Sequence, residues 1–310
     1  MFQDRSIAVV VPAHNEERLI AKTIRTMPQL VDWIVVVDDA SDDATSDRAR
    51  SVGDTRVQLI RHDVNRGVGG AIVTGHMRAV ELEADVAVVM AGDAQMDPSY
   101  LPDLVRPITE EGYGFTKATR FFSPTSFAKM PRTRLVGNIV VSFLTKLATG
   151  YWHLFDPLNG YTAISREALT RIPLDRIKQD YSFECDLLVW LNAYHVRARD
   201  VPVPPVYGDE VSGVRLPRAS VRLLRALTRG FWRRVLVKYV LWSFAPFALL
   251  LFGGLAMLAL GTAVGIFVLV NSIGPPVAST ATVLISVGPL MLGVQFLVLA
   301  LVLDILEEPR

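Results

Sequence analysis

The chain has 310 residues, 51% of them hydrophobic, and its 32 basic residues nearly balance 31 acidic ones, for a formal net charge of +1. That balance averages two unlike parts, because residues 1–210 carry 23 basic and 28 acidic residues whereas residues 239–303 contain no Asp, Glu, Lys, Arg or His. The long uncharged run excludes a wholly soluble protein and a disordered chain, and the single Cys185 excludes a scaffold held by intrachain disulfides.

Short apolar runs alternate with amphipathic segments through the first hundred residues. Runs rich in Val and Ile, bounded by polar turns, predict buried strands at 7–11, 33–37, 57–60 and 86–90. The segments between and after them predict helices at 16–27, 45–51, 69–83 and 98–111. This alternation predicts an α/β domain with a mostly parallel sheet that is covered on both faces.

Polar or glycine-rich segments follow all four predicted strands, at residues 12–16, 38–43, 65–70 and 92–97. Ligands of parallel sheets bind beyond the carboxyl ends of the strands, so these segments predict a site for a phosphorylated ligand and a cation. Asp93 and Gln95 alternate on one side of an extended segment. Their hard oxygen donors suit Mg²⁺ or Mn²⁺, completed by diphosphate oxygens.

The uncharged run near the C-terminus is long enough for two membrane crossings. Residues 271–276 include one glycine and two prolines, which divide the run into predicted spans at 241–270 and 283–303. Before them, residues 213–238 form a basic, amphipathic juxtamembrane segment, and its arginines recur at helical spacing at Arg218, Arg222, Arg225, Arg229 and Arg233. The positive-inside rule places this segment and the preceding domain in the cytoplasm. We therefore expect a cytosolic domain at 1–212 and a membrane domain at 239–310.

Six motifs in this order resemble the family 2 glycosyltransferases of the GT-A fold. They are residues 9–17, 36–41, 65–71, 92–98, 117–121 and 156–161. Within that family the chain looks like the polyprenyl-phosphate glycosyltransferases, the group of dolichol-phosphate mannose synthase and the undecaprenyl-phosphate glucosyltransferases. One position departs from the pattern, because Ala91 stands where the metal segment often has the first Asp of Asp-x-Asp.

The resemblance implies an inverting, metal-dependent hexosyltransferase that moves a sugar from a nucleotide-diphosphate sugar to a polyprenyl phosphate. The donor nucleotide would be bound by Pro12, Asn15, Glu16, Asp38, Asp39, Asn65, Gly67, Gly70 and Asp93. Asp93 and Gln95 would hold the Mg²⁺ or Mn²⁺. The acceptor phosphate would meet Lys117, Arg120, Arg132 and Arg134, and the residues assigned to catalysis are Asp93, Arg120 and Arg134. A phosphate monoester is mostly dianionic at neutral pH, so it needs no strong general base.

Two alternatives stay open at this point. The acceptor could be a lipid or glycan hydroxyl, with Glu184 or Asp186 as the base, or Ala91 could mark a non-catalytic membrane protein that binds sugar nucleotides. The expected location is the cytoplasmic membrane, as a multi-pass protein in contact with membrane lipids. No nucleic-acid partner is expected, and the sequence leaves open whether the chain forms a homo-oligomer.

Overall fold

The computed structural model describes residues 2–120, 132–156, 159–180, 182–204, 216–271 and 279–310. In two of its helices it describes only the backbone, at residues 132–136, 138 and 216–222. The chain divides into two units, one of Met1–Trp232 with Pro309–Arg310 and one of Arg233–Glu308.

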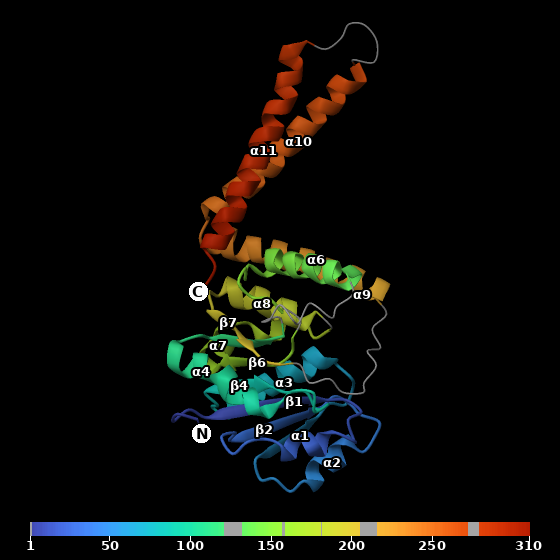
Figure 1. Ribbon diagram of the computed structural model, residues 1–310, viewed down its shortest axis with the longest axis vertical. Helices are drawn as coiled ribbons and strands as arrows, with labels where there is room; N and C mark the ends of the chain where they lie inside the picture. The colour runs from blue at the N-terminus through green and yellow to red at the C-terminus, as the bar shows by residue number, and fades with distance from the viewer. Residues whose placement is uncertain (1, 121–131, 157–158, 181, 205–215, 272–278) are drawn as a thin grey trace. The chain divides into compact units, whose positions relative to one another are not determined.

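A seven-stranded sheet forms the centre of the first unit (Figure 1). Its strands are β1 (Ile7–Ala13), β2 (Trp33–Asp38), β3 (Val57–Arg61), β4 (Val86–Val89), β5 (Phe115–Thr119), β6 (Thr162–Ser165) and β7 (Ala198–Pro202). Their order across the sheet is β3-β2-β1-β4-β6-β5-β7. Strand β6 runs antiparallel to β4 and β5, and the other neighbouring pairs are parallel. The predicted mostly parallel sheet is therefore confirmed.

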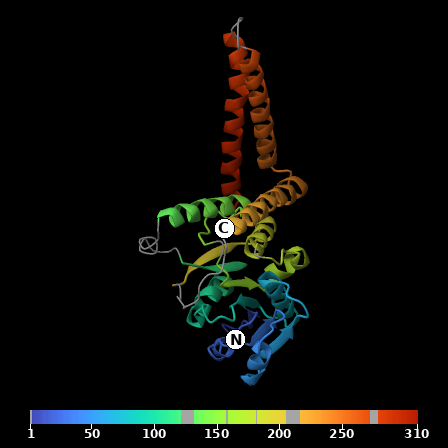
Figure 2. The ribbon, with the colours of Figure 1, turned by 90° about the vertical axis from the view of Figure 1, so that its right-hand side faces the viewer.

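Helices cover both faces of this sheet, as the apolar strands require. Successive residues of β1 point to opposite faces of the sheet and pack into two different hydrophobic cores. Val9 and Val11 belong to the first core, and Ala8 belongs to the second. The first core is closed by α1 (Ile20–Arg25) and α4 (Leu101–Glu111). The second is closed by α3 (Val68–Glu81) and α8 (Phe183–Ala193), so β1 is buried along its whole length (Figures 1 and 2).

The first helix is shorter than the segment 16–27 that amphipathicity predicts. The main-chain N–H groups of Asn15, Glu16 and Glu17 donate to the side chains of Ser41, Thr45 and Asp43 respectively. These groups face the loop after β2, and α1 begins only at Ile20. The segment predicted at 98–111 likewise begins as a 3₁₀ turn, η1 (Pro98–Tyr100).

The remaining elements of the first unit lie around this framework. They are α2 (Thr45–Ser51), α6 (Arg132–Thr149), α7 (Arg166–Arg171), the 3₁₀ turn η2 (Leu174–Arg176) and α9 (Leu216–Arg234), whose last two residues belong to the second unit. Helix α9 lies within the predicted juxtamembrane segment, and its arginines Arg225 and Arg229 are exposed.

Two long helices, α10 (Pro246–Asn271) and α11 (Thr280–Leu306), pack side by side in the second unit (Figures 1 and 2). Their most apolar windows have mean hydropathies of 2.2 and 2.3, yet only 11% and 17% of those windows are buried. Core helices of a soluble protein would be mostly buried, so length, hydropathy and exposure all favour membrane association.

Helix α10 begins several residues later than the predicted span at 241. The preceding segment Val235–Trp242 is the π-helix η3, and Phe244, two residues before Pro246, has a positive φ of 43°. The two long helices approach closely at small residues. A Cβ atom on Gly261 would come within 2.9 Å of the Leu290 main-chain nitrogen, which explains why glycine occupies that position.

A buried ion pair joins the two ends of the second unit. The guanidinium of Arg234 contacts both carboxylate oxygens of Asp304, and the Tyr239 hydroxyl donates to the same carboxylate over 2.6 Å. Arg234 and Asp304 are 0% and 2% exposed. The acidic residue at the end of α11 is therefore a structural partner of the basic juxtamembrane segment.

Candidate active site

The end of β1 and the loop after it contact the segments that follow the other three predicted strands. The Asn15 N–H donates to Ser41 Oγ over 2.9 Å, and the Asp42 N–H donates to Asn15 Oδ1 over 2.9 Å. His14 approaches the Asn65 amide at 3.3 Å, and the Gly92 N–H donates to the Pro12 carbonyl over 3.1 Å. Residues far apart in sequence thus meet beside β1, where strand order reverses between β2 and β4, the position at which parallel sheets bind ligands.

Asp38 is fully buried at the end of β2. Its Oδ1 accepts the Ser41 N–H over 2.9 Å and its Oδ2 accepts the Ser46 hydroxyl, with Arg61 at 3.6 Å. Burial by itself would raise the pKa of this carboxyl, but the hydrogen bonds from Ser41 and Ser46 and the charge of Arg61 outweigh burial and lower the pKa. Asp38 is therefore an ionised carboxylate whose two oxygens both shape the loop after β2.

Asp39 holds the glycine loop that precedes α3. Its carboxylate accepts the N–H groups of Arg66 over 2.9 Å and of Gly67 over 2.7 Å. Gly67 has a φ of +82°, which disfavours a side chain at that position, and its Cβ would stand 3.0 Å from the Gln179 carbonyl. A Cβ on Gly70 would lie 2.6 Å from the Arg66 Cβ, so this turn requires both glycines.

His62 was not among the residues singled out in the sequence, although it contacts Asp39. Its ring bridges the Asp39 carboxylate at 2.7 Å and the Thr74 hydroxyl at 2.9 Å. The residue follows the last residue of β3, and its place at a strand end is the signal that could have identified it. His62 therefore supports the same loop that Asp39 positions.

The segment after β4 presents the two predicted metal ligands. Asp93 Oδ1 accepts the Gln95 N–H over 3.0 Å, which closes a tight turn, and both residues are partly exposed. The described residues contain no cluster of three or more His, Cys, Asp or Glu side chains that could hold a metal ion. A cation on Asp93 and Gln95 would accordingly need further ligands, such as substrate oxygens and water.

Strand register brings the end of β5 to the same edge as this segment. Val89 of β4 and Lys117 of β5 both pair with Thr162 of β6, so the three residues stand at one level of the sheet. Neighbouring strands are roughly 4.8 Å apart, which separates the β4 and β5 backbones by about 10 Å there. Arg120 follows β5 directly and therefore lies at the edge that carries Asp93.

The Arg120 guanidinium is held by a carboxylate. Its Nε donates to Asp156 Oδ2 over 2.7 Å and its Nη2 donates to Asp156 Oδ1 over 3.0 Å. The arginine side chain is 47% exposed, whereas that of Asp156 is 4% exposed. Arg120 is thus presented to solvent in a fixed orientation by a buried partner.

Lys117 was predicted to contact the acceptor phosphate directly, but its side chain is buried in the structure. Its side chain is 1% exposed, and its ammonium donates to the Asp156 carbonyl and lies 3.6 Å from Asp200. Since it faces the interior, a phosphate at the surface could not reach it in this structure. The side chains of Arg132 and Arg134, in the first turn of α6, lie outside the described residues.

Glu184 and Cys185 lie at the start of α8. Burial raises the pKa of the Glu184 carboxyl, and the charge of Lys117 only partly opposes this. Burial likewise raises the pKa of the Cys185 thiol to about 12, so this cysteine is not a nucleophile at neutral pH. Asp186 accepts the Lys178 N–H over 2.9 Å, which gives it a structural contact.

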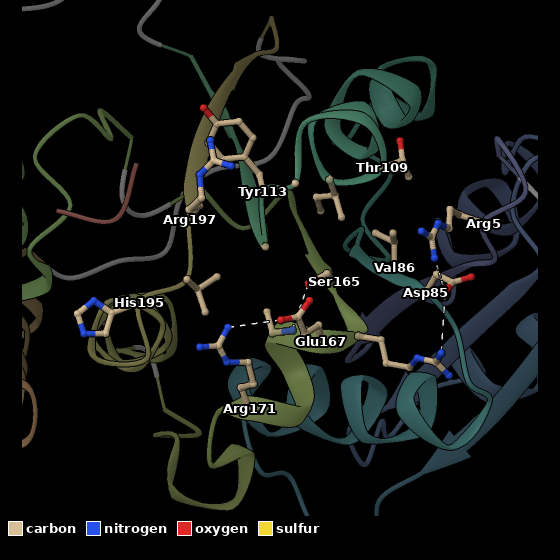
Figure 3. A pocket seen from close by; sticks show the side chains of 16 residues that line it. Arg5, Asp85, Val86, Thr109, Tyr113, Ser165, Glu167, Arg171, His195 and Arg197 are labelled. Carbon is tan, nitrogen blue, oxygen red and sulfur yellow. Dashed lines mark hydrogen bonds and ion pairs between the residues drawn. The ribbon is translucent and has the colours of Figure 1, made fainter. Parts of the chain in front are cut away.

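A cavity of about 380 Å³ lies at the opposite edge of the sheet, by the first residues of β4 and β5 (Figure 3). It is lined by four arginines, but these already contact protein groups. Arg5 and Arg166 lie 3.5 and 4.0 Å from Asp85, and Arg171 lies 3.5 Å from Glu167. Arg197 donates to the Glu111 carbonyl over 3.2 Å. The predicted residues in the loops that follow β1, β2, β3, β4 and β5 lie at the other edge, beyond the carboxyl ends of those strands.

Comparison with known proteins confirms the family that the six sequence motifs indicate. The model of the family described as Glycosyl transferase family 2 matches residues 8–172. A UDP-N-acetylglucosamine–dolichyl-phosphate N-acetylglucosaminyltransferase from Methanococcus voltae is 30% identical, over 66% of this chain and 88% of its own. An undecaprenyl-phosphate mannosyltransferase from Micrococcus luteus is 27% identical, over 64% of this chain and 82% of its own.

The fold is also found among solved structures. A glucosyl-3-phosphoglycerate synthase from Mycobacterium tuberculosis, crystallised with Mn²⁺, UDP-glucose and phosphoglyceric acid, superposes with a TM-score of 0.54. It is 24% identical, and the match covers 74% of this chain and 80% of that one. The likeness supports the shared α/β architecture of the first unit.

Proposed function

Because the chain belongs to glycosyl transferase family 2, we propose that it transfers a sugar from a nucleotide-diphosphate sugar to the phosphate of a polyprenyl lipid, with inversion at the anomeric carbon. The main structural support for this proposal is the set of loops and charged side chains that lie together at one edge of the sheet. Four linked loops stand beside a surface arginine that a buried carboxylate orients. The names of the relatives from Methanococcus voltae and Micrococcus luteus support a polyprenyl phosphate as the acceptor class.

The donor nucleotide would occupy the loops after β1, β2 and β3. Pro12, Asn15 and Glu16 would shape one wall of the pocket, while Asp38 would act on the base or ribose through the loop that both its oxygens hold. Asp39 would do so through the loop it holds as well as through its own charge. Asn65, Gly67 and Gly70 would let the diphosphate approach the N-terminus of α3, a 14-residue helix whose dipole favours an anion.

The donors at Asp93 and Gln95 fit Mg²⁺ or Mn²⁺. One carboxylate oxygen of Asp93 accepts the Gln95 N–H, and no interaction of its other oxygen occurs among the described residues. A carboxylate and an amide oxygen are hard donors, and magnesium sites commonly combine one or two carboxylates with substrate phosphates and water. When bound, the ion would neutralise the charge of the departing nucleoside diphosphate.

Positive charge from the protein would bring the acceptor phosphate close to the donor. Two anionic groups repel each other, and a guanidinium donates a planar fork of N–H groups that matches phosphate oxygens. Arg120 would provide this contact, together with Arg134 and Arg132 from α6. The lipid phosphate would then attack the anomeric carbon without transferring a proton to a protein base.

The two apolar helices α10 and α11 suit an acceptor that lies in a bilayer. The basic residues before them would place the first unit at the cytoplasmic face, with α10 and α11 as two crossings of the membrane. Membrane lipids would then contact the exposed side chains of both helices.

The decisive experiment incubates the purified full-length protein with a panel of radiolabelled nucleotide sugars, Mn²⁺ and undecaprenyl phosphate. We expect label in the organic extract that requires both lipid and metal, and an Asp93→Asn variant should produce none. Transfer only to a hydroxyl lipid, abolished in Glu184→Gln, would instead establish a base-dependent acceptor. Donor binding without any transfer would establish a sugar-nucleotide sensor.

A further inference from the structure

An ion pair with a buried lysine lies on the strand that precedes Arg120. Lys117 of β5 and Asp200 of β7 are paired residues of neighbouring parallel strands, and Lys117 Nζ lies 3.6 Å from Asp200 Oδ1. Burial lowers the pKa of the Lys117 ammonium, and the charges of Asp200 and Asp156 oppose that effect. Burying a lysine costs desolvation free energy, and a buried ion pair adds little stability compared with apolar packing. Stability alone therefore does not explain why Lys117 is buried.

Both members of this pair contact the segment that carries Asp156. The Lys117 ammonium donates to the Asp156 carbonyl, and the Phe155 N–H donates to Asp200 Oδ2 over 2.6 Å. The pair therefore fixes the peptide units on either side of Phe155 and Asp156. This leaves Asp156 a buried carboxylate with a fixed position.

That carboxylate in turn determines the orientation of Arg120. The two hydrogen bonds, of 2.7 and 3.0 Å, engage Nε and Nη2 on one edge of the guanidinium, which fixes its plane. A planar group is useful for phosphate recognition only when its plane is correctly set. The contacts run in one series, from Asp200 and Lys117 through Asp156 to Arg120.

We propose that Lys117 and Asp200 are positioning residues for the acceptor phosphate, which act by holding Asp156 and, through it, the plane of Arg120. This inference rests on the proposed function. It assigns Asp200 a role that its sequence position alone does not indicate. It also moves Lys117 from direct phosphate contact to indirect support.

The test uses full-length protein in detergent and three variants. Asp156→Asn weakens the hold on Arg120. The double variant Lys117→Met with Asp200→Asn removes both charges of the ion pair together, so that neither is left unpaired. Asp54→Asn is the matched control, because Asp54 also holds an arginine through two oxygens, with Asp54 Oδ2 at 2.7 Å from Arg56 Nη2, but before β3. Calorimetry gives the donor dissociation constant, and transfer kinetics give kcat and KM for the polyprenyl phosphate.

We expect Asp156→Asn and the double variant each to lower kcat/KM for the lipid at least tenfold, up to the roughly 150-fold that one charge-assisted contact is worth. Donor affinity should stay within twofold, and Asp54→Asn should leave both quantities unchanged. If the folded double variant had the wild-type kcat/KM for the lipid, the ion pair would have only a structural role, and the inference would be wrong. A parallel loss of donor affinity would overturn it too, while absence of transfer by the wild-type protein would refute the proposed function itself.

Discussion

At the scale of single residues, His76 is the clearest case of an unsatisfied polar group. It is 1% exposed in α3, and neither ring nitrogen has a hydrogen-bond partner among the described residues. Burial lowers its pKa from 6.5 to about 4, so the folded protein holds the ring neutral. As the pH falls below 6.5, His76 is protonated in the unfolded chain but stays neutral in the folded protein. The free energy of unfolding therefore decreases from pH 6.5 down to about pH 4.

Replacing His76 with Met should therefore stabilise the protein and flatten its acid sensitivity. At neutral pH we expect a gain of about 1–3 kcal/mol, the usual penalty of an unpaired buried polar group. Between pH 6.5 and 4 the wild-type protein should lose up to about 3 kcal/mol that the variant keeps. Denaturant unfolding followed by tryptophan fluorescence at several pH values measures both effects, and equal pH slopes in the two proteins would contradict this reading.

Asp93 is the residue on which the metal assignment depends. Asp93→Asn should fold normally yet lower turnover by several orders of magnitude, because the proposed ion, which would neutralise the departing diphosphate, would no longer be held. Metal-dependent turnover kinetics check this, with circular dichroism for folding. Asp103→Asn, an exposed change on α4, serves as the control. Undiminished turnover of Asp93→Asn in the presence of chelator would show that no metal acts there.

At the scale of elements, the buried Arg234–Asp304 pair fastens the start of η3 to the end of α11. Removing one partner leaves the other charge buried, which typically costs about 3–5 kcal/mol. Asp304→Asn should accordingly lower the thermal midpoint in detergent by several degrees. The double variant Arg234→Met with Asp304→Leu should recover most of that loss, since apolar packing replaces such pairs well.

Thermal unfolding of the purified variants, followed by circular dichroism, provides the measurement. The Arg229→Gln variant is a suitable control, because Arg229 is exposed on α9 and its loss should not shift the transition. Should Asp304→Asn match the wild-type midpoint, the pair would contribute nothing to the helical unit.

At the scale of the whole molecule, the predicted topology places both termini in the cytoplasm and only residues 271–282 outside. The reason is the concentration of arginines before α10, combined with two apolar helices. In a Cys185→Ser background, a membrane-impermeant thiol reagent added to whole cells should label a cysteine introduced at Ser272 and spare one at Ser212. The reverse pattern would invert the orientation, and labelling of neither site in intact cells would argue against two crossings.

The sequence alone was sufficient for the positions and mostly parallel arrangement of the first four strands, the two apolar helices and the loops that meet at one edge. Apolar periodicity is a local property that reports which segments are buried, and parallel strands place their carboxyl-end loops together whatever their exact register. The start of α1 was placed too early, since the N–H groups of residues 15–17 bond to Ser41, Thr45 and Asp43 instead.

Only the tertiary structure decided which of the predicted charged residues are exposed and which are buried. Lys117 and Arg120 are three positions apart and are both predicted phosphate ligands, but β7 pairs with β5 and buries the lysine against Asp200. In the sequence, Asp304 is part of a short charged tail. In the structure, it forms an ion pair with Arg234, which lies 70 residues earlier. Such pairs depend on which elements become neighbours, and that is fixed by packing across long sequence separations rather than by local pattern.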